Sequence, residues 1–532
     1  MKTKFYFGAF AALALGFASC SSDEPINGPV DPDGPTVGDK YMAVVIQNIG
    51  STGRALPGDT DFEGPANGSS ESTFTADDIR FYFFTESGQP FLMVNNGVNG
   101  EVSNTNMVKP YELKTENTNG AEDNIEGYLV LGTPAAGYLG NEPAKVFCIV
   151  NPIGHDFEYY AEKSLDELKN EKVTYNIDKD AFSKFVMTNS TYEKGGKEIY
   201  YTDVTGCIES DPTEAKKNPA RIYLERLAAK VRVKDLGTKV VCEKGTPTNP
   251  EKEFTIRGID GKVKLDVELV GWELINQAKK TNAIKNITSC LTTAPFEDWN
   301  DETRHRSYWA ITAAQADDDF YKNTFNIKTD AFALKSYDAS KPTENIAYCY
   351  GNTYFADDVE SVNDRTTNAT AILVKGIVKK KGSTEALDLV CWGGDYFTTG
   401  TFKQYVIDAW NNEHNSSLTA DKVTFVNQTS GGVTLKPNTW MVNVDGSNWS
   451  RFKDFMWWEN GVTSYYLNIK HTPGGKFGVV RNHIYDYKIT DVIGLGIPGS
   501  EPENPEETTP TYLAAVVYCL NWRVVSNTTV LE

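Results

Sequence analysis

The strongest β-strand pattern in the sequence lies near its C-terminal end, at Tyr512–Val525, which reads YLAAVVYCLNWRVV. Every second residue is apolar, a period typical of a strand that buries one face. The residues of this apolar face are Tyr512, Ala514, Val516, Tyr518, Leu520, Trp522 and Val524. As one strand the segment would be about 46 Å long. Burying the side chains larger than alanine would contribute roughly 9–18 kcal/mol gross. An exposed strand of this kind promotes aggregation, so we expect it to be covered.

The segment before this strand decides what can cover it. Gly499–Pro510 (GSEPENPEETTP) is acidic and rich in proline, as flexible linkers are. We therefore treat residues 499–532 as a linker and a C-terminal strand. The linker lets the strand either return to the sheet of its own domain or reach another molecule, and both alternatives stay open at this point.

A second strong strand is predicted near the other end, at Tyr41–Ile49 (YMAVVIQNI), with Met42, Val44 and Ile46 on one face. A glycine-rich polar loop follows at 50–59, and Arg54 is its only basic residue. Such loops are exposed and open to proteases. A trypsin-like enzyme would cut between Arg54 and Ala55. The alternative is an ordinary surface arginine.

The first residues have the pattern of an export signal. Lys2 and Lys4 precede an apolar run at 5–17, and small residues lead to Cys20. Residues 1–19 are predicted to be a signal peptide, because the apolar run is too short for a permanent membrane span. Cys20 stands where a lipobox places the lipid-bearing cysteine, although Phe17 replaces the usual leucine. The alternative is an ordinary secretory signal. Residues 20–40 are rich in proline and glycine and are predicted to be a flexible tether.

The composition predicts a mostly β protein. Among 532 residues there are 27 Tyr, 26 Phe, 43 Gly and 23 Pro, which favours strands joined by many turns. The net charge of −20 disfavours nucleic acid and anionic membranes as partners. A polar break at 211–218 suggests two β-rich domains, at 55–215 and 216–498. Strands are expected at 79–84, 127–131, 146–150, 227–233, 263–270, 440–444, 465–469 and 484–492, and helices at 164–172 and 401–412.

Several internal segments add a family resemblance. They are VFCIVN at 146–151, FVMTNS at 185–190, LERLAAKV at 224–231, RSYW at 306–309, YCYGNT at 348–353 and VVRNHIY at 479–485. With the cysteine at position 20 and the arginine at 54, they resemble the Bacteroidales fimbrillins (type V pilins). The greatest similarity is to the minor-fimbrium, Mfa-like shaft subunits. The resemblance runs over nearly the whole chain. Gly351 stands where relatives usually have glutamate.

The resemblance implies two tandem transthyretin-like β-sandwich domains and a structural role in a fimbrium that supports adhesion and biofilm formation. It implies export as a palmitoylated lipoprotein of the outer membrane, with the lipid on Cys20 as its only membrane contact. An arginine-specific protease would cut after Arg54 and release residues 41–54. The C-terminal strand of the next subunit would then fill the vacated groove. The implied partners are further copies of the chain, tip and anchor subunits and the lipoprotein export machinery. Because the chain has both the cleavable loop and the C-terminal strand, the shaft is favoured.

Motifs for chemistry are not found in the sequence, so we expect no enzyme, no cofactor and no metal. The five histidines lie outside metal-ligand spacings, and no nucleophile elbow or phosphate loop occurs. Asp317–Asp319 is an acidic cluster that either binds a cation or forms a solvated turn. Aromatic pairs at 457–458 and 465–466 motivate the alternative function, a glycan-binding or adhesive surface lipoprotein that acts as a tip or accessory subunit.

Overall fold

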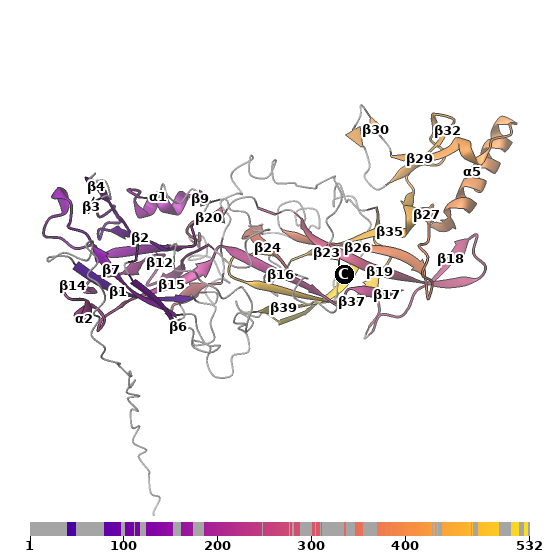
Figure 1. Ribbon diagram of the computed structural model, residues 1–532. Coiled ribbons are helices and arrows are strands. Elements are labelled where there is room, and N and C mark those ends of the chain that lie inside the picture. Colours follow the sequence, from indigo (N-terminus) through magenta and orange to yellow (C-terminus); the bar gives the residue numbers. More distant parts are fainter. Residues whose placement is uncertain are drawn as a thin grey trace, which may run out of the picture.

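The computed structural model describes most of the predicted domains. The described residues are 40–48, 79–96, 102–110, 112–116, 124–152, 161–173, 186–246, 248–275, 277–278, 281–287, 300–303, 305–308, 310, 335–336, 346–354, 370–427, 429–430, 433–434, 439–469, 471, 477–499, 512–520 and 526–529. They form mainly strands, with few helices, which confirms the prediction of a mostly β protein. Two large sheets lie end to end in an elongated molecule (Figure 1).

The first sheet contains most of the early strands. Its order is β5 (Met107–Val108), β2 (Ile79–Phe84), β8 (Lys145–Val150), β10 (Met187–Asn189), β15 (Ala220–Arg226), β1 (Lys40–Asn48), β7 (Asn124–Leu131) and β6 (Glu112–Glu116). Two short strands branch from it, β13 (Thr202–Asp203) from β8 and β14 (Ile208–Glu209) from β1. The first strand of the chain is therefore placed well inside the sheet.

The second sheet is larger and branched. Its main order is β24 (Ile346–Tyr350), β16 (Ala228–Lys234), β37 (Ile484–Ile493), β17 (Gly237–Cys242), β19 (Lys262–Ile275), β18 (Glu253–Arg257), β28 (Asp395–Thr398), β27 (Leu389–Trp392) and β34 (Met456–Trp458). The branches are β23 (Lys335–Ser336), β26 (Ala371–Lys380), β35 (Val462–Asn468), β38 (Ile497–Pro498), β39 (Tyr512–Leu520) and β40 (Ser526–Thr529).

Short sheets decorate both halves. They are β3 (Met93–Asn96) with β4 (Val102–Thr105), β9 (Lys172–Val173) with β20 (Thr281–Asn282), β11 (Tyr192–Lys194) with β12 (Lys197–Ile199), β21 (Asn300–Asp301) with β22 (Arg306–Ser307), β25 (Asn352–Tyr354) with β36 (Phe477–Val479), β30 (Thr429–Ser430) with β31 (Val433–Thr434), and β29 (Val423–Asn427), β32 (Trp440–Val444) and β33 (Ser447–Trp449). The strands predicted at 79–84 and 440–444 have these bounds, and the other predicted strands lie on described strands with ends shifted by a few residues.

The helices form where capping residues allow them. The helix α1 (Leu165–Asn170) begins after Ser164, which forms a capping box with Glu167. The helix α5 (Thr399–His414) begins after Thr398 and buries Phe402 and Val406. Both predicted helices are confirmed. Among the described residues, the remaining short helices are α2 (Pro212–Ala215), η4 (Ala136–Tyr138), η10 (Ala420–Lys422) and η11 (Glu459–Gly461).

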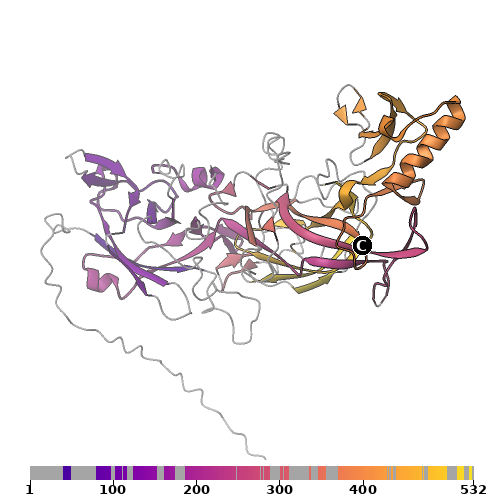
Figure 2. The same ribbon diagram turned by 45° about the vertical axis from the view of Figure 1, so that its right-hand side comes forward.

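Three apolar clusters hold the described parts together. One lies under the first sheet and one under the second. The third is rich in aromatic residues and packs α5 against β29 and β32 in a lobe that projects from the second sheet (Figure 2). The third cluster was not predicted, and the number of β-sandwiches stays a prediction. Within the described part of the chain, no helix is both long and apolar enough to cross a membrane.

The two large sheets are joined by an almost unbroken pair of strands. β15 ends at Arg226 in the first sheet, and β16 begins at Ala228 in the second. Only Leu227 separates them, and it is buried. The changeover therefore falls at Leu227, some residues after the predicted break at 211–218, which instead contains α2. The domain limits themselves stay a prediction.

Candidate functional site, an interior strand slot and a C-terminal strand

β1 is hydrogen-bonded along both of its edges. On one side it pairs antiparallel with β7, from Lys40 opposite Leu131 to Gln47 opposite Asn124. On the other side it pairs first with β14 and then, in parallel, with β15, where Val44 lies opposite Ala220. The first strand is therefore an interior strand, and its place between β7 and β15 is called the β1 slot below.

Three consecutive side chains of β1 are buried. Met42, Ala43 and Val44 are 0%, 5% and 1% exposed, and Met42 and Val44 belong to the core of the first sheet. Ile46 lies in β1 opposite Ile125 and Ile222. Burial of Met42 and Val44 contributes about 3–6 kcal/mol gross. The only described ion pair of β1 is exposed, between Lys40 Nζ and Glu142 Oε1 at 3.3 Å, and contributes little.

The β1 slot would be unstable if it were empty. Without β1, facing edges of β7 and β15 would expose unpaired backbone N–H and C=O groups beside an apolar cavity. Unpaired edges of this kind recruit other strands. A strand with apolar residues at every second position would remove both sources of instability. Its backbone would pair with the two exposed edges, and its apolar side chains would fill the cavity.

The C-terminal strand β39 lies in the second sheet, near the middle of the molecule, whereas the β1 slot lies in the first sheet (Figure 1). It pairs antiparallel with β37, from Tyr512 opposite Ile493 to Leu520 opposite Ile484, with an irregularity between Ile489 and Asp491. In the single chain, the strand therefore covers the edge of its own sheet. Of the two alternatives that the sequence left open, this structure contains the intramolecular one.

The register of β39 on β37 determines which positions share a face, since residues directly opposite in an antiparallel pair lie on the same side. The odd positions of β39 lie opposite core residues of the second sheet: Leu513, Ala515, Val517 and Cys519 face Val492, Ile489, Tyr487 and Tyr485. The even positions Ala514, Val516 and Tyr518 lie opposite Asp491, Lys488 and Asp486. The middle of the apolar face predicted from the sequence is thus registered with charged residues of β37, whereas its ends, Tyr512 and Leu520, lie opposite the apolar residues Ile493 and Ile484.

The polar face of β37 has its own partners. Asp486 accepts hydrogen bonds from Arg232 Nη2 at 2.8 Å and from Lys234 Nζ at 2.6 Å. Lys488 is exposed and lies 3.3 Å from Asp235. These charged groups are poor neighbours for Ala514, Val516 and Tyr518 of β39. The pairing with β37 therefore provides β39 with backbone hydrogen bonds, but it places apolar positions of β39 beside charged groups.

β39 is shorter than the predicted strand of fourteen residues. It ends at Leu520, and β40 pairs back onto it antiparallel, with Tyr518 opposite Ser526 and Ala515 opposite Thr529. The chain therefore reverses between them, so the single straight strand over 512–525 is wrong for this structure. The physical reason is that β37, the strand that it pairs with, begins at Ile484 and offers no partner beyond Leu520. Trp522 and Val524 lie outside the described residues.

The strands next to the slot and next to β39 are linked through the backbone. β15 forms one wall of the β1 slot and continues into β16, which pairs in parallel with β37 from Lys230 opposite Ile484 to Lys234 opposite Lys488. β37 in turn pairs with β39. A pull on either end of the subunit is therefore transmitted through adjacent strands.

A buried ionic cluster fixes the point where β15 becomes β16. Arg481 Nε donates to Glu225 Oε1 at 2.8 Å, and Lys285 Nζ donates to Glu225 Oε2 at 2.6 Å. All three side chains are at most 3% exposed. Burial lowers the pKa of Lys285 to about 8, against the opposing effect of Glu225. The cluster joins the two segments LERLAAKV and VVRNHIY, which the sequence shows only as separate motifs.

A chain of hydrogen bonds lies beside this cluster. The Val480 N–H donates to Tyr485 Oη at 2.6 Å, and Tyr485 Oη lies 2.7 Å from His471 Nδ1. His471 Nε2 lies 2.6 Å from the carbonyl oxygen of Tyr308, so Nε2 donates and Nδ1 accepts. Burial lowers the pKa of His471 to about 4 and lowers that of His483 well below its usual value. Both rings are therefore neutral at physiological pH.

The aromatic pairs that suggested a glycan site are largely packed. Trp458 and Tyr465 are core residues at 2% and 0% exposure. Trp457 is half-buried and contacts Phe425 and Trp440 edge to face, with ring centroids 5.0 and 5.9 Å apart. These pairs therefore do not form an exposed sugar platform.

Several predicted site residues are not described. Cys20, Arg54, Ala55 and Asp317–Asp319 lie outside the described residues, so their roles stay predictions. The sequence did not reveal β7 and β15 as the slot walls. It also did not reveal the Glu225–Arg481 pair, although charged residues inside apolar strand patterns were the available signal. Within the residues that the structure covers, no group of three or more His, Cys, Asp or Glu is placed to hold a metal ion. Cys148, Cys207, Cys242 and Cys391 are free thiols.

Comparisons with known proteins identify the C-terminal part of the chain. Residues 457–528, from β34 to β40, match the family model "Major fimbrial subunit protein type IV, Fimbrillin, C-terminal". The match confirms the resemblance to the fimbrillins, a family of fimbrial subunits. No curated protein matches the sequence.

Similar solved structures include a candidate cell adhesion protein from Parabacteroides distasonis, at 12% identity and TM-score 0.41, covering 91% of this chain and 97% of that one. A fimbrial assembly protein from the same species has 10% identity and TM-score 0.31, with 92% and 99% covered. The tip fimbrial protein Mfa3 from Porphyromonas gingivalis has 10% identity and TM-score 0.28, with 91% and 100% covered. Because these TM-scores are low, no conclusion is based on the structural similarities.

Proposed function

We propose, from the premise that the C-terminal region of this chain is that of a fimbrillin, that the protein is a structural subunit of a cell-surface fimbrium. In this proposal the chain polymerises by strand exchange. The strand β1 leaves the first sheet, and β39 of a neighbouring copy enters the β1 slot. Contacts of this head-to-tail kind do not close on themselves and therefore build a filament.

The interior position of β1 is the observation that carries the proposal. The loss of an edge strand would expose only one new edge of the sheet. β1 is bonded to β7 on one side and to β14 and β15 on the other, so its departure opens a slot with two hydrogen-bonding walls. An incoming strand can bond to both walls and fill the cavity left by Met42 and Val44.

The register of β39 supports the same conclusion. On its own sheet, the odd positions of β39 share the core face, and Ala514, Val516 and Tyr518 are registered with charged residues of β37. In this register the middle of the even-numbered apolar face lies beside charged groups, so an apolar acceptor would stabilise it further. The β1 slot, which holds apolar side chains between two strands, is such an acceptor. Insertion of β39 into it would add stabilisation that the pairing with β37 does not provide.

The processing steps complete the proposal. The precursor is exported as a lipoprotein anchored through Cys20 and is located at the outer membrane. Cleavage between Arg54 and Ala55 by an arginine-specific protease removes the covalent connection between β1 and its own domain. Assembly then becomes irreversible in practice, because the intramolecular competitor for the slot is lost. The mature subunit is part of an extracellular fimbrium, together with tip and anchor subunits.

The test is limited proteolysis of the delipidated protein with an arginine-specific protease, followed by native gel electrophoresis and electron microscopy. We expect an early cut after Arg54 and then ladders or filaments. Arg54→Lys is the matched control, because it keeps the charge but removes the cleavage site. Filaments formed equally by the Arg54→Lys protein, or a resistant Arg54 in the wild type, would show that cleavage at this position is not the switch.

A second candidate function is a glycan-binding or adhesive surface lipoprotein that acts as a tip or accessory subunit. One observation favours it: β39 covers the edge of its own sheet in the single chain. A subunit whose β39 stays paired with β37 cannot insert this strand into the β1 slot of another copy. A protein that is cut after Arg54 but stays monomeric would support this second candidate.

A further inference from the structure

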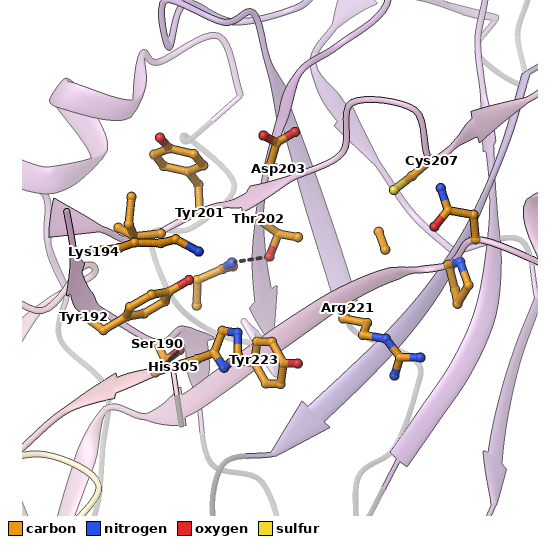
Figure 3. A pocket seen from close by; sticks show the side chains of 15 residues that line it. Ser190, Tyr192, Lys194, Tyr201, Thr202, Asp203, Cys207, Arg221, Tyr223 and His305 are labelled. Carbon is orange, nitrogen blue, oxygen red and sulfur yellow. Dashed lines mark hydrogen bonds between the residues drawn. The ribbon is translucent and has the colours of Figure 1, made fainter. Parts of the chain in front are cut away.

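A cavity of about 510 Å³ opens on the first sheet, beside the hairpin of β11 and β12 and the outer face of β15. This volume is within the range of roughly 300–1,000 Å³ that is usual for sites of small ligands. Figure 3 shows that the labelled side chains come from segments far apart in the sequence, including Tyr192, Arg221 and His305. All lining residues belong to the first half of the molecule apart from His305.

Aromatic rings form one part of the wall. The rings of Tyr223 and His305 are stacked, with centroids 4.0 Å apart and an interplanar angle of 23°. Tyr192 meets His305 at 5.3 Å and 73°, edge to face. Tyr201 lines another part of the cavity, away from these three rings (Figure 3), and has Lys145 Nζ 4.7 Å from its ring centroid. The cavity is therefore lined by four half-buried rings, three of which form one contacting group.

Polar groups face the rings from the rest of the cavity. Asp203 and Arg221 are exposed and line it from β13 and β15. Asp203 Oδ1 accepts the N–H of Thr205 at 2.8 Å, which orients the carboxylate and leaves its second oxygen for a ligand. Asn189 Nδ2 donates to Thr202 Oγ1 at 3.2 Å and holds the floor in place (Figure 3).

The charges of the cavity nearly cancel. Lys194 is paired with Glu302 at 3.1 Å, so one carboxylate and one guanidinium remain to meet a ligand. This balance disfavours a strongly charged ligand, because either sign would meet one repulsive group. A pyranose sugar fits the combination well. Its C–H face is apolar and packs on aromatic rings, and its rim of hydroxyl groups can bond to a carboxylate and a guanidinium at the same time.

We propose that this cavity is a binding site for a neutral saccharide of one or two pyranose rings. Tyr192 and Tyr201 would contact the C–H face of the sugar, and Asp203 and Arg221 would bond to its hydroxyl groups. The site is separate from the aromatic pairs at 457–458 and 465–466. It does not depend on strand exchange, and it would give each copy of the subunit its own sugar contact.

The site lies next to the β1 slot. β15 carries Arg221 and Tyr223 opposite Val45 and Gln47 of β1, so a strand that replaces β1 becomes the new neighbour of this wall. Both the uncleaved precursor and the assembled fibre should therefore bind the sugar, but with different affinities.

The test is saturation-transfer NMR on the uncleaved, delipidated protein, followed by titration calorimetry of any sugar that binds. The neutral probes are the methyl glycosides of glucose, galactose and fucose and free N-acetylglucosamine. The anionic probes are N-acetylneuraminic acid and inorganic phosphate. We expect at least one neutral probe to bind and Asp203→Asn to weaken it by about tenfold or more. We expect Tyr201→Ala to abolish binding.

Two variants keep the result interpretable. Asp260→Asn changes an exposed aspartate outside the cavity and should leave the affinity unchanged. Tyr201→Phe keeps the ring and should retain most of the affinity, which separates lost stacking from a fold that is damaged by Tyr201→Ala. The proposal is overturned if no neutral probe binds, if only the anionic probes bind, or if Asp203→Asn and Asp260→Asn behave alike.

Discussion

Glu225 and Arg481 lie 256 residues apart in the sequence and meet at 2.8 Å in the buried junction between the two large sheets. Glu225 is the last residue but one of β15, a wall of the β1 slot, and Arg481 lies just before β37, on which β39 pairs. Lys285 bonds to the second oxygen of the same carboxylate. One carboxylate thus holds together the strand that faces the slot and the strand that holds the C-terminal end.

Removal of the Glu225 charge should be strongly destabilising. Glu225→Gln leaves Arg481 and Lys285 buried without an anion, and breaking a buried pair typically costs about 3–5 kcal/mol. Denaturant unfolding measures this loss. Asp395→Asn is the matched control, because it breaks the exposed ion pair with Arg257 and should cost less than about 1 kcal/mol. Equal, small losses for the two variants would show that the junction does not depend on the cluster.

The free energy of unfolding should fall as the pH drops below about 6.5. In the folded chain, burial holds the pKa of His471 at about 4, compared with an ordinary value of 6.5. Between these values the unfolded chain takes up a proton that the folded chain refuses, so stability is present above pH 6.5 and is lost as the pH falls to about 4. The loss from this ring is roughly 3 kcal/mol.

Unfolding curves at a series of pH values test this acid dependence. The His471→Gln protein should have a shallower pH dependence than the wild type over this range. His414 is exposed at the end of α5, so His414→Gln should leave the dependence unchanged. A His471→Gln protein with the same pH slope as the wild type would contradict the assignment to this ring.

Two neighbouring positions of β39 should respond in opposite ways to a charge. Val517 is registered with Tyr487 on the core face, and Val516 with exposed Lys488. In the uncleaved single chain, Val517→Asp should release β39, and Val516→Asp should be tolerated. Hydrogen exchange of the β37 amides measures this release.

After cleavage, the same pair of variants tests the exchange itself. If the even-numbered face enters the β1 slot, Val516→Asp should prevent filament formation, because a carboxylate would be buried in an apolar cavity without a partner. Filaments of the Val516→Asp protein at wild-type yield would mean that this face does not enter the slot.

Met42 should stabilise the precursor and have no effect on the mature subunit. Met42 is fully buried in the core of the first sheet, so Met42→Ala should cost about 2–5 kcal/mol in the uncleaved chain. Lys40→Ala removes only the exposed pair with Glu142 and should cost less than about 1 kcal/mol. Thermal unfolding of the uncleaved chain and of the filaments formed after cleavage measures the effects of the two variants. A Met42→Ala effect that persists in filaments would show that β1 stays with its subunit.

Much of the local structure was predictable from short patterns. The apolar run at 79–84 and the serine-capped helix at 165–170 depend on neighbours in sequence, so their periodicity and caps were sufficient. The strand at Tyr41–Ile49 was also evident. Its interior position was not, because the partners on both sides, β7 and β15, lie far away in the sequence. The reversal between β39 and β40 was missed for a related reason, since the length of β37 limits the pairing.

By itself, the sequence determined that the protein is mostly β and that it has two strongly patterned strands with apolar faces, one near each end. These are properties of side-chain order along the chain, which periodicity records directly. Only the tertiary structure decided that β1 is bonded on both edges, that Glu225 meets Arg481, and that the middle of the even face of β39 is registered with charged residues of β37. Each of these depends on which distant strands become neighbours and in which register, and a shift of one residue would reverse every face.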